Sequence, residues 1–206
     1  MQIEAIKKDK LHLVKICFAD GSEVLIDKSV CAERCLSVGM ELDEDALREL
    51  AFDSDYTRAK SRAVWYLDRS DHTEKGLYEK LLRAGFSKEA SAKVIARFVE
   101  VGLLNDERYA ENLASRLMEA NVSKREAVQK MLIKGVPYDL IKQVLSENET
   151  DEQAQIKNLL DKKYRTKLMG ADGAQKVFAA LVRKGFSYGA VREALKSYVE
   201  AEEDYV

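Results

Sequence analysis

The sequence predicts a mainly α-helical fold, with three tandem three-helix repeats forming an elongated body after a small β-rich N-terminal domain. Gly85, Gly135 and Gly185 stand fifty residues apart, and each lies between a pair of apolar residues and a further apolar residue. From about residue 57 apolar residues recur at helical spacing, whereas near the N-terminus they alternate as in strands. A period of this length is typical of one supersecondary unit used several times.

Residues 1–42 are predicted to form a small β-meander. Three stretches combine alternation with β-branched residues, namely Ile3 to Ala5, Leu11 to Phe18 and Glu23 to Ile26. Asp20-Gly21 is a hairpin-turn signal between the second and third stretches. Residues 29–36 are expected to form a short helix that Gly39 breaks. Because three strands alone are only marginally stable, we expect this sheet to pack on the first repeat.

A connecting helix is predicted over residues 43–56. Asp43, Glu44 and Asp45 place three acids at its beginning, where the helix dipole favours negative charge. The remaining chain divides into the three repeats, predicted at residues 57–104, 105–150 and 151–206.

Within each repeat the second helix is expected to end at the recurring glycine. Glycine at this position adopts the left-handed conformation, and the following apolar side chain folds back onto the last turn. Ser87 and Ser187 then cap the third helix, and Pro137 suits the first turn of the corresponding helix in the second repeat. The polar, acidic run at residues 146–151 is the predicted flexible joint.

The composition suits a helical protein with a well-solvated surface. Of the 206 residues, 46% are hydrophobic and 34% charged, and the formal net charge is −2. Residues 1–56 hold seven Lys or Arg against thirteen Asp or Glu, whereas residues 57–104 hold ten against six. The whole chain is therefore not a uniformly basic nucleic-acid binder, but its first repeat is cationic and its N-terminal domain is acidic.

The residues suggest no enzyme, metal site or cofactor. The three cysteines, Cys17, Cys31 and Cys35, are an odd number confined to the first forty residues, so buried reduced thiols are expected rather than a disulfide framework. Cys31 and Cys35 have helical spacing, but structural zinc requires four ligands and few histidines are available. No phosphate-binding loop, metal-binding helix or nucleophile elbow is present. With no apolar membrane span or leader, a cytoplasmic protein is expected.

Three segments together resemble the bacterial RecX family. They are Ala63-Val64-Trp65-Tyr66-Leu67-Asp68-Arg69-Ser70, Leu81-Leu82-Arg83-Ala84-Gly85-Phe86 and Gly102-Leu103-Leu104-Asn105-Asp106-Glu107-Arg108-Tyr109-Ala110. The resemblance covers roughly residues 57–200. It implies a non-enzymatic regulator of the RecA recombinase, active in DNA repair, homologous recombination and the SOS response. Such a protein binds in the groove of the RecA–DNA filament and most often inhibits strand exchange, ATP hydrolysis and co-protease activity.

Exposed cations and one aromatic residue are the candidates for contacts with RecA or DNA. Trp65 departs from the inward stripe of its helix, so it either contacts a partner or packs on a neighbouring repeat. Each cation alone could instead complement a helix dipole or solvate the surface. As a set repeated along the chain they suggest a basic stripe. The candidates are Arg58, Arg62, Trp65, Arg69, Lys80, Arg83, Lys124, Arg125, Lys130, Lys134, Lys162, Lys163, Arg183 and Lys184.

Two other functions remain alternatives at the level of the sequence. A stand-alone helical-repeat DNA-binding protein would bind DNA without RecA, with strong salt dependence. A protein adaptor would use its acidic N-terminal domain to recruit another partner, which deletion of residues 1–56 would reveal. In the favoured interpretation the protein is a monomer whose partners are RecA and the RecA–DNA filament, with weak direct DNA binding and no membrane contact.

Overall fold

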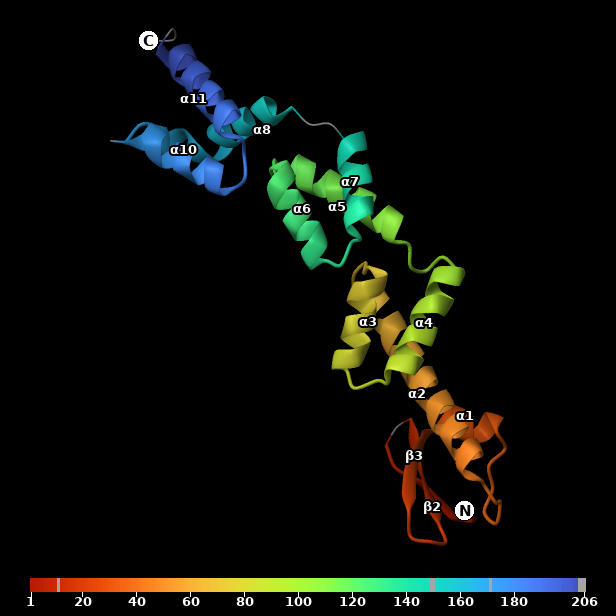
Figure 1. Ribbon diagram of the computed structural model, residues 1–206. Helices are drawn as coiled ribbons and strands as arrows, with labels where there is room; N and C mark the ends of the chain where they lie inside the picture. Colours follow the sequence, from red (N-terminus) through yellow and green to blue (C-terminus); the bar gives the residue numbers. More distant parts are fainter. Residues whose placement is uncertain (11, 149–150, 171, 204–206) are drawn as a thin grey trace. The chain divides into compact units, whose positions relative to one another are not determined.

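The computed structural model describes residues 1–10, 12–148, 151–170 and 172–203, which belong to two compact units (Figure 1). Unit 1 spans Met1–Asn105, and unit 2 begins at Asp106. The fold is mainly helical with a small N-terminal sheet, as the sequence predicts. Leu11, in the predicted second strand, and residues 149–150, in the predicted flexible joint, lie outside the described residues.

An antiparallel sheet of three strands in the order β1-β2-β3 opens unit 1. Its strands and the helix that follows are β1 Ile3–Lys8, β2 Leu13–Phe18, β3 Glu23–Asp27 and α1 Lys28–Glu33. Alternate residues of β2 are buried, which is the period of two that the sequence predicts. Ile16 and Ile26 are fully buried in a core that also contains Leu50 from the next helix. The sheet is therefore stabilised by a helix packed on one face.

The short helix α1 ends earlier than the sequence predicts. Cys35 adopts the left-handed conformation, with φ 50°, and its backbone N–H bonds to the carbonyl of Ala32 at 3.0 Å. Leu36 N–H returns to the carbonyl of Cys31 at 3.1 Å, which completes a helix-ending turn normally made with glycine. The helix was expected to reach residue 36 and to be broken by Gly39, but Cys35 already reverses the chain.

The predicted connecting helix and the first helix of the first repeat are one element, which corrects the expectation of two separate helices. Helix α2 runs without interruption over Glu44–Leu67, because no glycine or proline interrupts it near residue 57. Asp43 caps it by accepting a hydrogen bond from Ala46 N–H at 2.7 Å. Its first half packs on the sheet, where Ser54 Oγ accepts a hydrogen bond from the buried Asp27 N–H. The N-terminal domain and the first repeat therefore share a helix.

Three groups of helices follow one template, and we call them repeats 1, 2 and 3. Repeat 1 combines the second half of α2 with α3 Glu74–Arg83 and α4 Lys88–Glu100. Repeat 2 contains α5 Asp106–Glu119, α6 Lys124–Ile133 and α7 Tyr138–Glu147. Repeat 3 contains α8 Glu152–Leu159, the π-helical segment η1 Leu160–Tyr164, α9 Arg165–Leu168, α10 Gly173–Arg183 and α11 Tyr188–Glu203.

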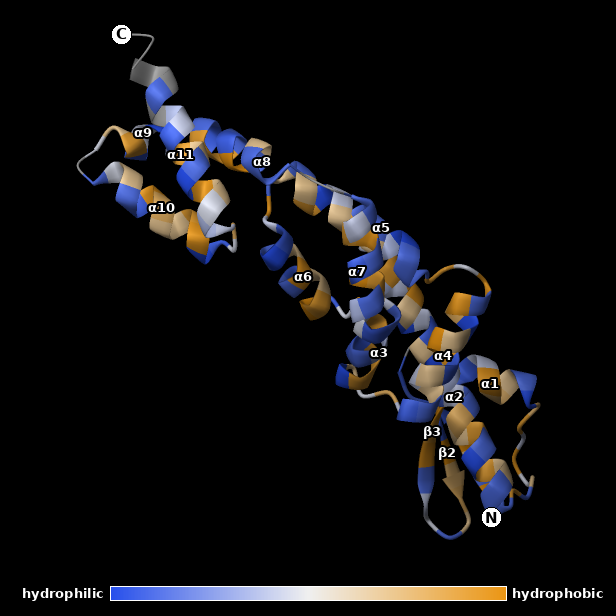
Figure 2. Cartoon of the chain, turned by 45° about the horizontal axis from the view of Figure 1, so that its top comes forward, coloured by the Kyte–Doolittle hydropathy of each residue, from blue (hydrophilic) through white to orange (hydrophobic). Residues whose placement is uncertain are grey.

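Each repeat has its own apolar core, drawn from one face of its helices. Apolar and polar residues share the same helices (Figure 2), and the equivalent residues Leu77, Ala127 and Val177 are all fully buried. The same holds for the next turn of the second helices, at Leu81, Met131 and Leu181. Repeat 3 departs from the template in its first helix, where the π-helical segment η1 interrupts regular α-helical pairing.

The three recurring glycines end the second helix of each repeat in the same way. Gly85, Gly135 and Gly185 have φ values of 90°, 86° and 94°, so all three occupy the left-handed conformation expected from the sequence. In each turn the residue after the glycine donates to a carbonyl five positions earlier, as Phe86 does to Leu81 at 3.2 Å. The apolar side chain that follows each glycine is thereby brought back onto its own helix.

A carboxylate from the first helix holds the start of the third helix in repeats 1 and 3. Asp55 accepts hydrogen bonds from Ser87 N–H at 2.8 Å and from Ser87 Oγ at 2.6 Å. Glu152 makes the equivalent pair with Ser187, at 2.7 Å to the backbone and 2.8 Å to the hydroxyl. We call these arrangements the carboxylate clasps. Repeat 2 has Pro137 at the equivalent position, and no side-chain hydrogen bond caps its third helix.

Candidate partner-binding surfaces

The first candidate surface lies on α2 and the turn that follows it. Arg58, Arg62, Trp65 and Arg69 are separated by four, three and four positions, so they share one face of the helix. All four side chains are exposed, whereas Ala59 and Ala63 between them are fully buried in the core of repeat 1. The helix therefore separates its core face from an outward stripe, which we call the cationic stripe.

Trp65 is the centre of the cationic stripe. Its side chain is 44% exposed, and the guanidinium carbon of Arg69 lies 3.6 Å from the centroid of its ring. Arg62 approaches the same ring at 5.4 Å. Arg69 Nη1 also donates to the Trp65 carbonyl at 3.0 Å, which holds the guanidinium against the ring. Such cation–π contacts contribute about 0.5–1 kcal/mol at exposed sites, so they orient the cations without removing their charge from solvent.

Lys80 is a further cation close to the stripe. It contacts Tyr66 and His72, which were not candidates at the level of the sequence. Lys80 Nζ lies 5.0 Å from the ring centroid of Tyr66 and 3.2 Å from His72 Nε2. Ser70 Oγ lies 3.2 Å from the same nitrogen. An ammonium group only donates hydrogen bonds, so the contact with Lys80 requires an unprotonated Nε2. No periodicity marks Tyr66 or His72 as functional. The packing of α3 against α2 brings Tyr66 beside Lys80, and His72 lies in the turn between the two helices.

The second candidate surface lies within unit 2, where repeats 2 and 3 meet. It brings together Lys124 and Arg125 at the start of α6 with Arg183 and Lys184 at the end of α10. Ser123 Oγ donates to the Lys184 carbonyl while accepting from Glu126 N–H at 3.2 Å. These residues are about sixty positions apart in the sequence, so only the tertiary structure assembles them.

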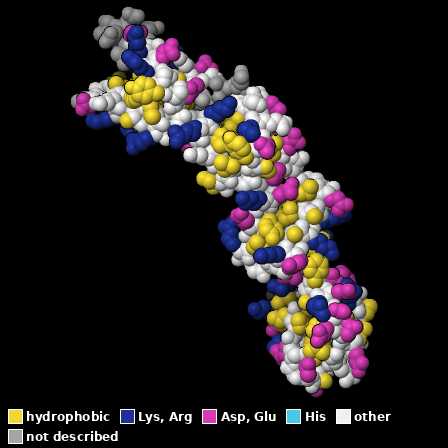
Figure 3. Space-filling view, viewed as in Figure 1, with side chains coloured by type: hydrophobic (Ala, Val, Ile, Leu, Met, Phe, Trp, Pro, Cys, Tyr) yellow, Lys and Arg dark blue, Asp and Glu magenta, His cyan; other side chains and the backbone are white. Residues whose placement is uncertain are grey.

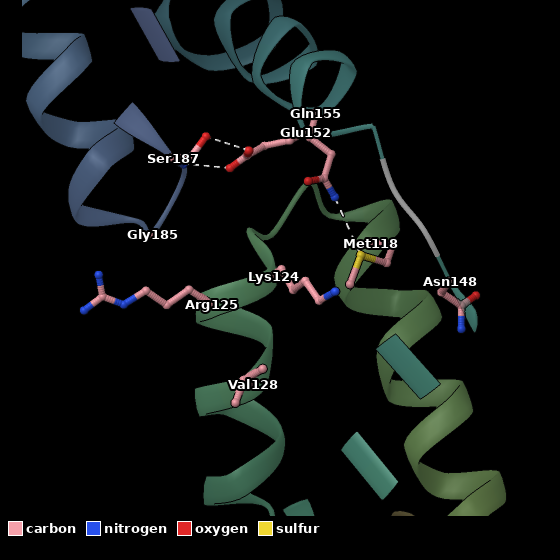
Figure 4. A pocket seen from close by; sticks show the side chains of 9 residues that line it. All are labelled: Met118, Lys124, Arg125, Val128, Asn148, Glu152, Gln155, Gly185 and Ser187. Carbon is pink, nitrogen blue, oxygen red and sulfur yellow. Dashed lines mark hydrogen bonds between the residues drawn. The ribbon is translucent and has the colours of Figure 1, made fainter. Parts of the chain in front are cut away.

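Two adjoining hollows at this place form what we call the repeat-junction groove (Figure 4). The larger has a volume of about 640 Å³ and the smaller of about 350 Å³. Arg125 and Gly185 line both. Gln155, which is only 6% exposed, closes the larger hollow and donates to Met118 Sδ at 3.6 Å and to the Val122 carbonyl at 3.5 Å.

The cations of the groove differ in how they are paired. Lys184 Nζ lies 4.0 Å from Glu126, whose other oxygen accepts from Lys130 at 2.8 Å. Within the described part of the chain, no carboxylate forms an ion pair with Lys124, Arg125 or Arg183. Cations without a fixed partner keep their charge available to a ligand.

The remaining candidates do not join either surface. Arg83 is paired with Glu79 on its own helix, with 3.4 Å between the charged groups. Lys162 and Lys163 lie on η1 and line neither hollow. Lys134 follows the last turn of α6 and also lines neither hollow. In the view of Figure 3, Lys and Arg side chains are interspersed with Asp and Glu, and acidic side chains are frequent over the N-terminal domain. Within each unit, the candidates that come together form one local surface, which is the cationic stripe in unit 1 and the groove between repeats 2 and 3 in unit 2.

The described residues contain no cluster of three or more His, Cys, Asp or Glu that could hold a metal ion. Cys17, Cys31 and Cys35 are free, and partial burial raises the pKa of the Cys31 thiol. Across the helices that the structure describes, none has the length and apolar character needed to cross a bilayer. The fold and these surfaces define a helical-repeat protein with two local groups of cations.

Comparisons with known proteins agree with this class. The family model of the RecX first three-helix domain matches residues 59–98, and that of the third three-helix domain matches residues 149–195. "Regulatory protein RecX" of Streptococcus sanguinis is 27% identical over 96% of this chain and 76% of its own length. The protein of the same name from Clostridium perfringens is 28% identical over 89% of this chain and 88% of its own.

Two solved structures have the same fold. A crystal structure of regulatory protein RecX matches with a TM-score of 0.66 and 24% identity, covering 95% of this chain and 98% of the other. RecX from Lactobacillus salivarius matches with a TM-score of 0.60 and 20% identity, covering 69% and 96%. The two domain models and the relatives that match nearly the whole chain support membership of the RecX family.

Proposed function

We propose that this protein regulates the RecA recombinase by binding in the groove of the RecA–DNA filament, and that it inhibits the filament's activity. The observation that carries the proposal is the pair of outward cationic surfaces on a chain of the RecX family. A helical filament presents the same subunit surface many times along its groove, so a protein built of repeats can contact several subunits at once. Several weak contacts made at once then combine through effective concentration.

The cationic stripe is the surface that we expect to make the strongest contact. Trp and Arg are enriched among the residues that dominate binding energy at interfaces. Trp65 presents an exposed ring that Arg69 already covers on one face, and Arg62 lies at the same ring. Because these residues are held by each other, they lose less conformational freedom on binding than separate flexible side chains would.

Titration of the protein into RecA-catalysed ATP hydrolysis on single-stranded DNA tests the proposal. We expect the hydrolysis rate to fall as the protein approaches stoichiometry with RecA. A variant carrying Arg62→Ala, Trp65→Ala and Arg69→Ala should need about tenfold more protein for half-inhibition, because it loses several interface side chains at once. Circular dichroism should remain unchanged, because all three side chains are exposed.

Arg97→Ala is the matched control for this experiment. Arg97 is an exposed arginine of repeat 1 that pairs with Glu100 at 2.7 Å and lies outside the stripe. Its removal should change half-inhibition by less than about twofold. An unchanged ATPase rate in excess wild-type protein would refute the proposal. Equal loss in the Arg97 variant would show that net charge, not the stripe, carries the effect.

A second function, DNA binding without RecA, is favoured by one observation. The stripe combines an exposed aromatic ring with several cations, which is the chemistry of surfaces that bind single-stranded nucleic acid. Arg58, Arg62, Arg69 and Lys80 would contact up to four phosphates. The logarithm of the binding constant should then fall against the logarithm of salt concentration with a slope of about −2 to −3. A flat salt response with a labelled oligonucleotide would exclude this function.

A further inference from the structure

The repeat-junction groove has walls of two chemical kinds. Met118 and Val128 give it aliphatic surface, and Lys124 extends its amine between α5 and α6 toward Met118 (Figure 4). Arg125 extends from the other side of α6 and lines both hollows (Figure 4). With a volume of about 640 Å³, the larger hollow accommodates a few side chains.

The two carboxylates in the walls are already engaged. Both oxygens of Glu152 accept hydrogen bonds from Ser187, one from its backbone and one from its hydroxyl. Glu126 accepts from Lys130 at 2.8 Å and faces Lys184 at 4.0 Å. Neither carboxylate therefore neutralises Lys124, so the groove retains a cation beside an aliphatic wall.

This chemistry fits an acidic peptide better than a nucleic acid. A phosphodiester chain brings a negative charge with each nucleotide and gains most from aromatic stacking. The residues that line the two hollows include no aromatic side chain on which a base could stack. A peptide segment instead supplies single carboxylates flanked by apolar side chains, which match Lys124 and the Met118–Val128 wall.

We propose that the repeat-junction groove binds an acidic segment of a partner protein, with Lys124 taking a carboxylate and the aliphatic wall taking an adjacent apolar side chain. Arg125, Arg183 and Lys184 at the smaller hollow add attraction for further carboxylates of the same segment. This inference rests on the proposed function only for the occasion on which the protein meets such a partner. Binding of a peptide to the groove can be tested without RecA.

Fluorescence anisotropy with a short labelled peptide that alternates glutamate with leucine tests the site on the full chain. We expect saturable binding with a dissociation constant of about 0.1 mM or tighter. Lys124→Ala should weaken binding about tenfold, the loss expected from one charge-assisted hydrogen bond. Arg183→Ala should weaken peptide binding several-fold, because it removes a cation that lines the smaller hollow. Lys142→Ala is the matched control, because Lys142 lies on α7 outside the groove and pairs with Asp139 at 3.0 Å.

Three outcomes would overturn the inference. They are no binding at millimolar peptide, equal binding by the Lys124→Ala variant, and equal binding of a peptide with glutamine in place of every glutamate. Inorganic tripolyphosphate separates the two anion chemistries. Tripolyphosphate and unlabelled glutamate-leucine peptide are each titrated against the bound labelled peptide. If tripolyphosphate displaces the labelled peptide at the lower concentration, the groove prefers phosphate and the acidic-peptide assignment is wrong. Lys124 is exposed, so its removal should leave the fold intact, as circular dichroism checks.

Discussion

Gly85 in repeat 1 and Gly185 in repeat 3 end equivalent helices with the same turn, but their surroundings differ. Their φ values are 90° and 94°, and the following phenylalanine folds back in both. A Cβ built on Gly85 would meet no other atom within 4 Å. A Cβ on Gly185 would lie 2.9 Å from Arg125 Cβ and 2.9 Å from Ser123 Oγ. One motif therefore ends a helix in repeat 1, and in repeat 3 it also permits close contact between two repeats.

Two turns with the same local motif and conformation can therefore make different tertiary contacts. The turn itself requires only a left-handed residue, which glycine adopts without a steric penalty. The contact with α6 additionally requires that no side chain stand on Gly185. The same contact positions Arg183 and Lys184 beside Lys124 and Arg125, so the groove exists because repeat 3 approaches repeat 2 at a glycine.

The largest effect should come from Gly185→Ala. The substitution places a side chain in the left-handed conformation and forces it against Arg125 and Ser123. We expect unit 2 to lose about 3 kcal/mol of unfolding free energy, from backbone strain and overpacking together. Hydrogen exchange measured by mass spectrometry should show faster exchange in α6 and α10. Peptide binding to the groove should weaken as well.

Gly85→Ala is the matched control for this comparison. It has the same backbone strain but open space around the new methyl group, so a loss of about 1 kcal/mol is expected. Trp65 is the single tryptophan of the chain and lies in repeat 1, so its fluorescence reports this loss and should not respond to Gly185→Ala. Equal losses of unfolding free energy at the two glycines would contradict the difference in their surroundings.

A smaller effect should come from breaking a carboxylate clasp. Glu152→Ala removes the acceptor for both hydrogen bonds of Ser187 at the start of α11. We expect unit 2 to lose about 1–2 kcal/mol, the range measured for lost helix caps. Chemical denaturation followed by circular dichroism measures it. Asp139→Ala serves as the control, since it breaks an exposed pair with Lys142 and should leave the transition almost unchanged. A Glu152 variant as stable as this control would exclude a stabilising clasp.

The local structure was largely predictable because its causes are local. Apolar spacing located the helices, and the glycines at period fifty located the turns that end the second helix of each repeat. The break expected near residue 57 was wrong because nothing in the sequence there stops a helix, and Asp55 and Tyr56 already belong to repeat 1 through the Ser87 clasp and the core. A truncation intended to remove the N-terminal domain should therefore end before residue 43 and keep α2 complete.

The candidate surfaces were predictable only in part. Charge counts indicated that repeat 1 is cationic, and helical spacing placed Arg58, Arg62, Trp65 and Arg69 on one face. The contact between Lys80 on α3 and Tyr66 on α2 was not predictable in this way, because it depends on the distance between two helices, which no single segment encodes.

The sequence by itself determined the three-helix repeats, their turns and the sheet that precedes them, because hydrophobic periodicity, capping residues and left-handed glycines act within a few residues of one another. The tertiary structure alone decided that Lys124, Arg125, Arg183 and Lys184 meet at one groove. Such meetings depend on how whole surfaces pack, and the free energy of packing is spread over many residues far apart in the chain.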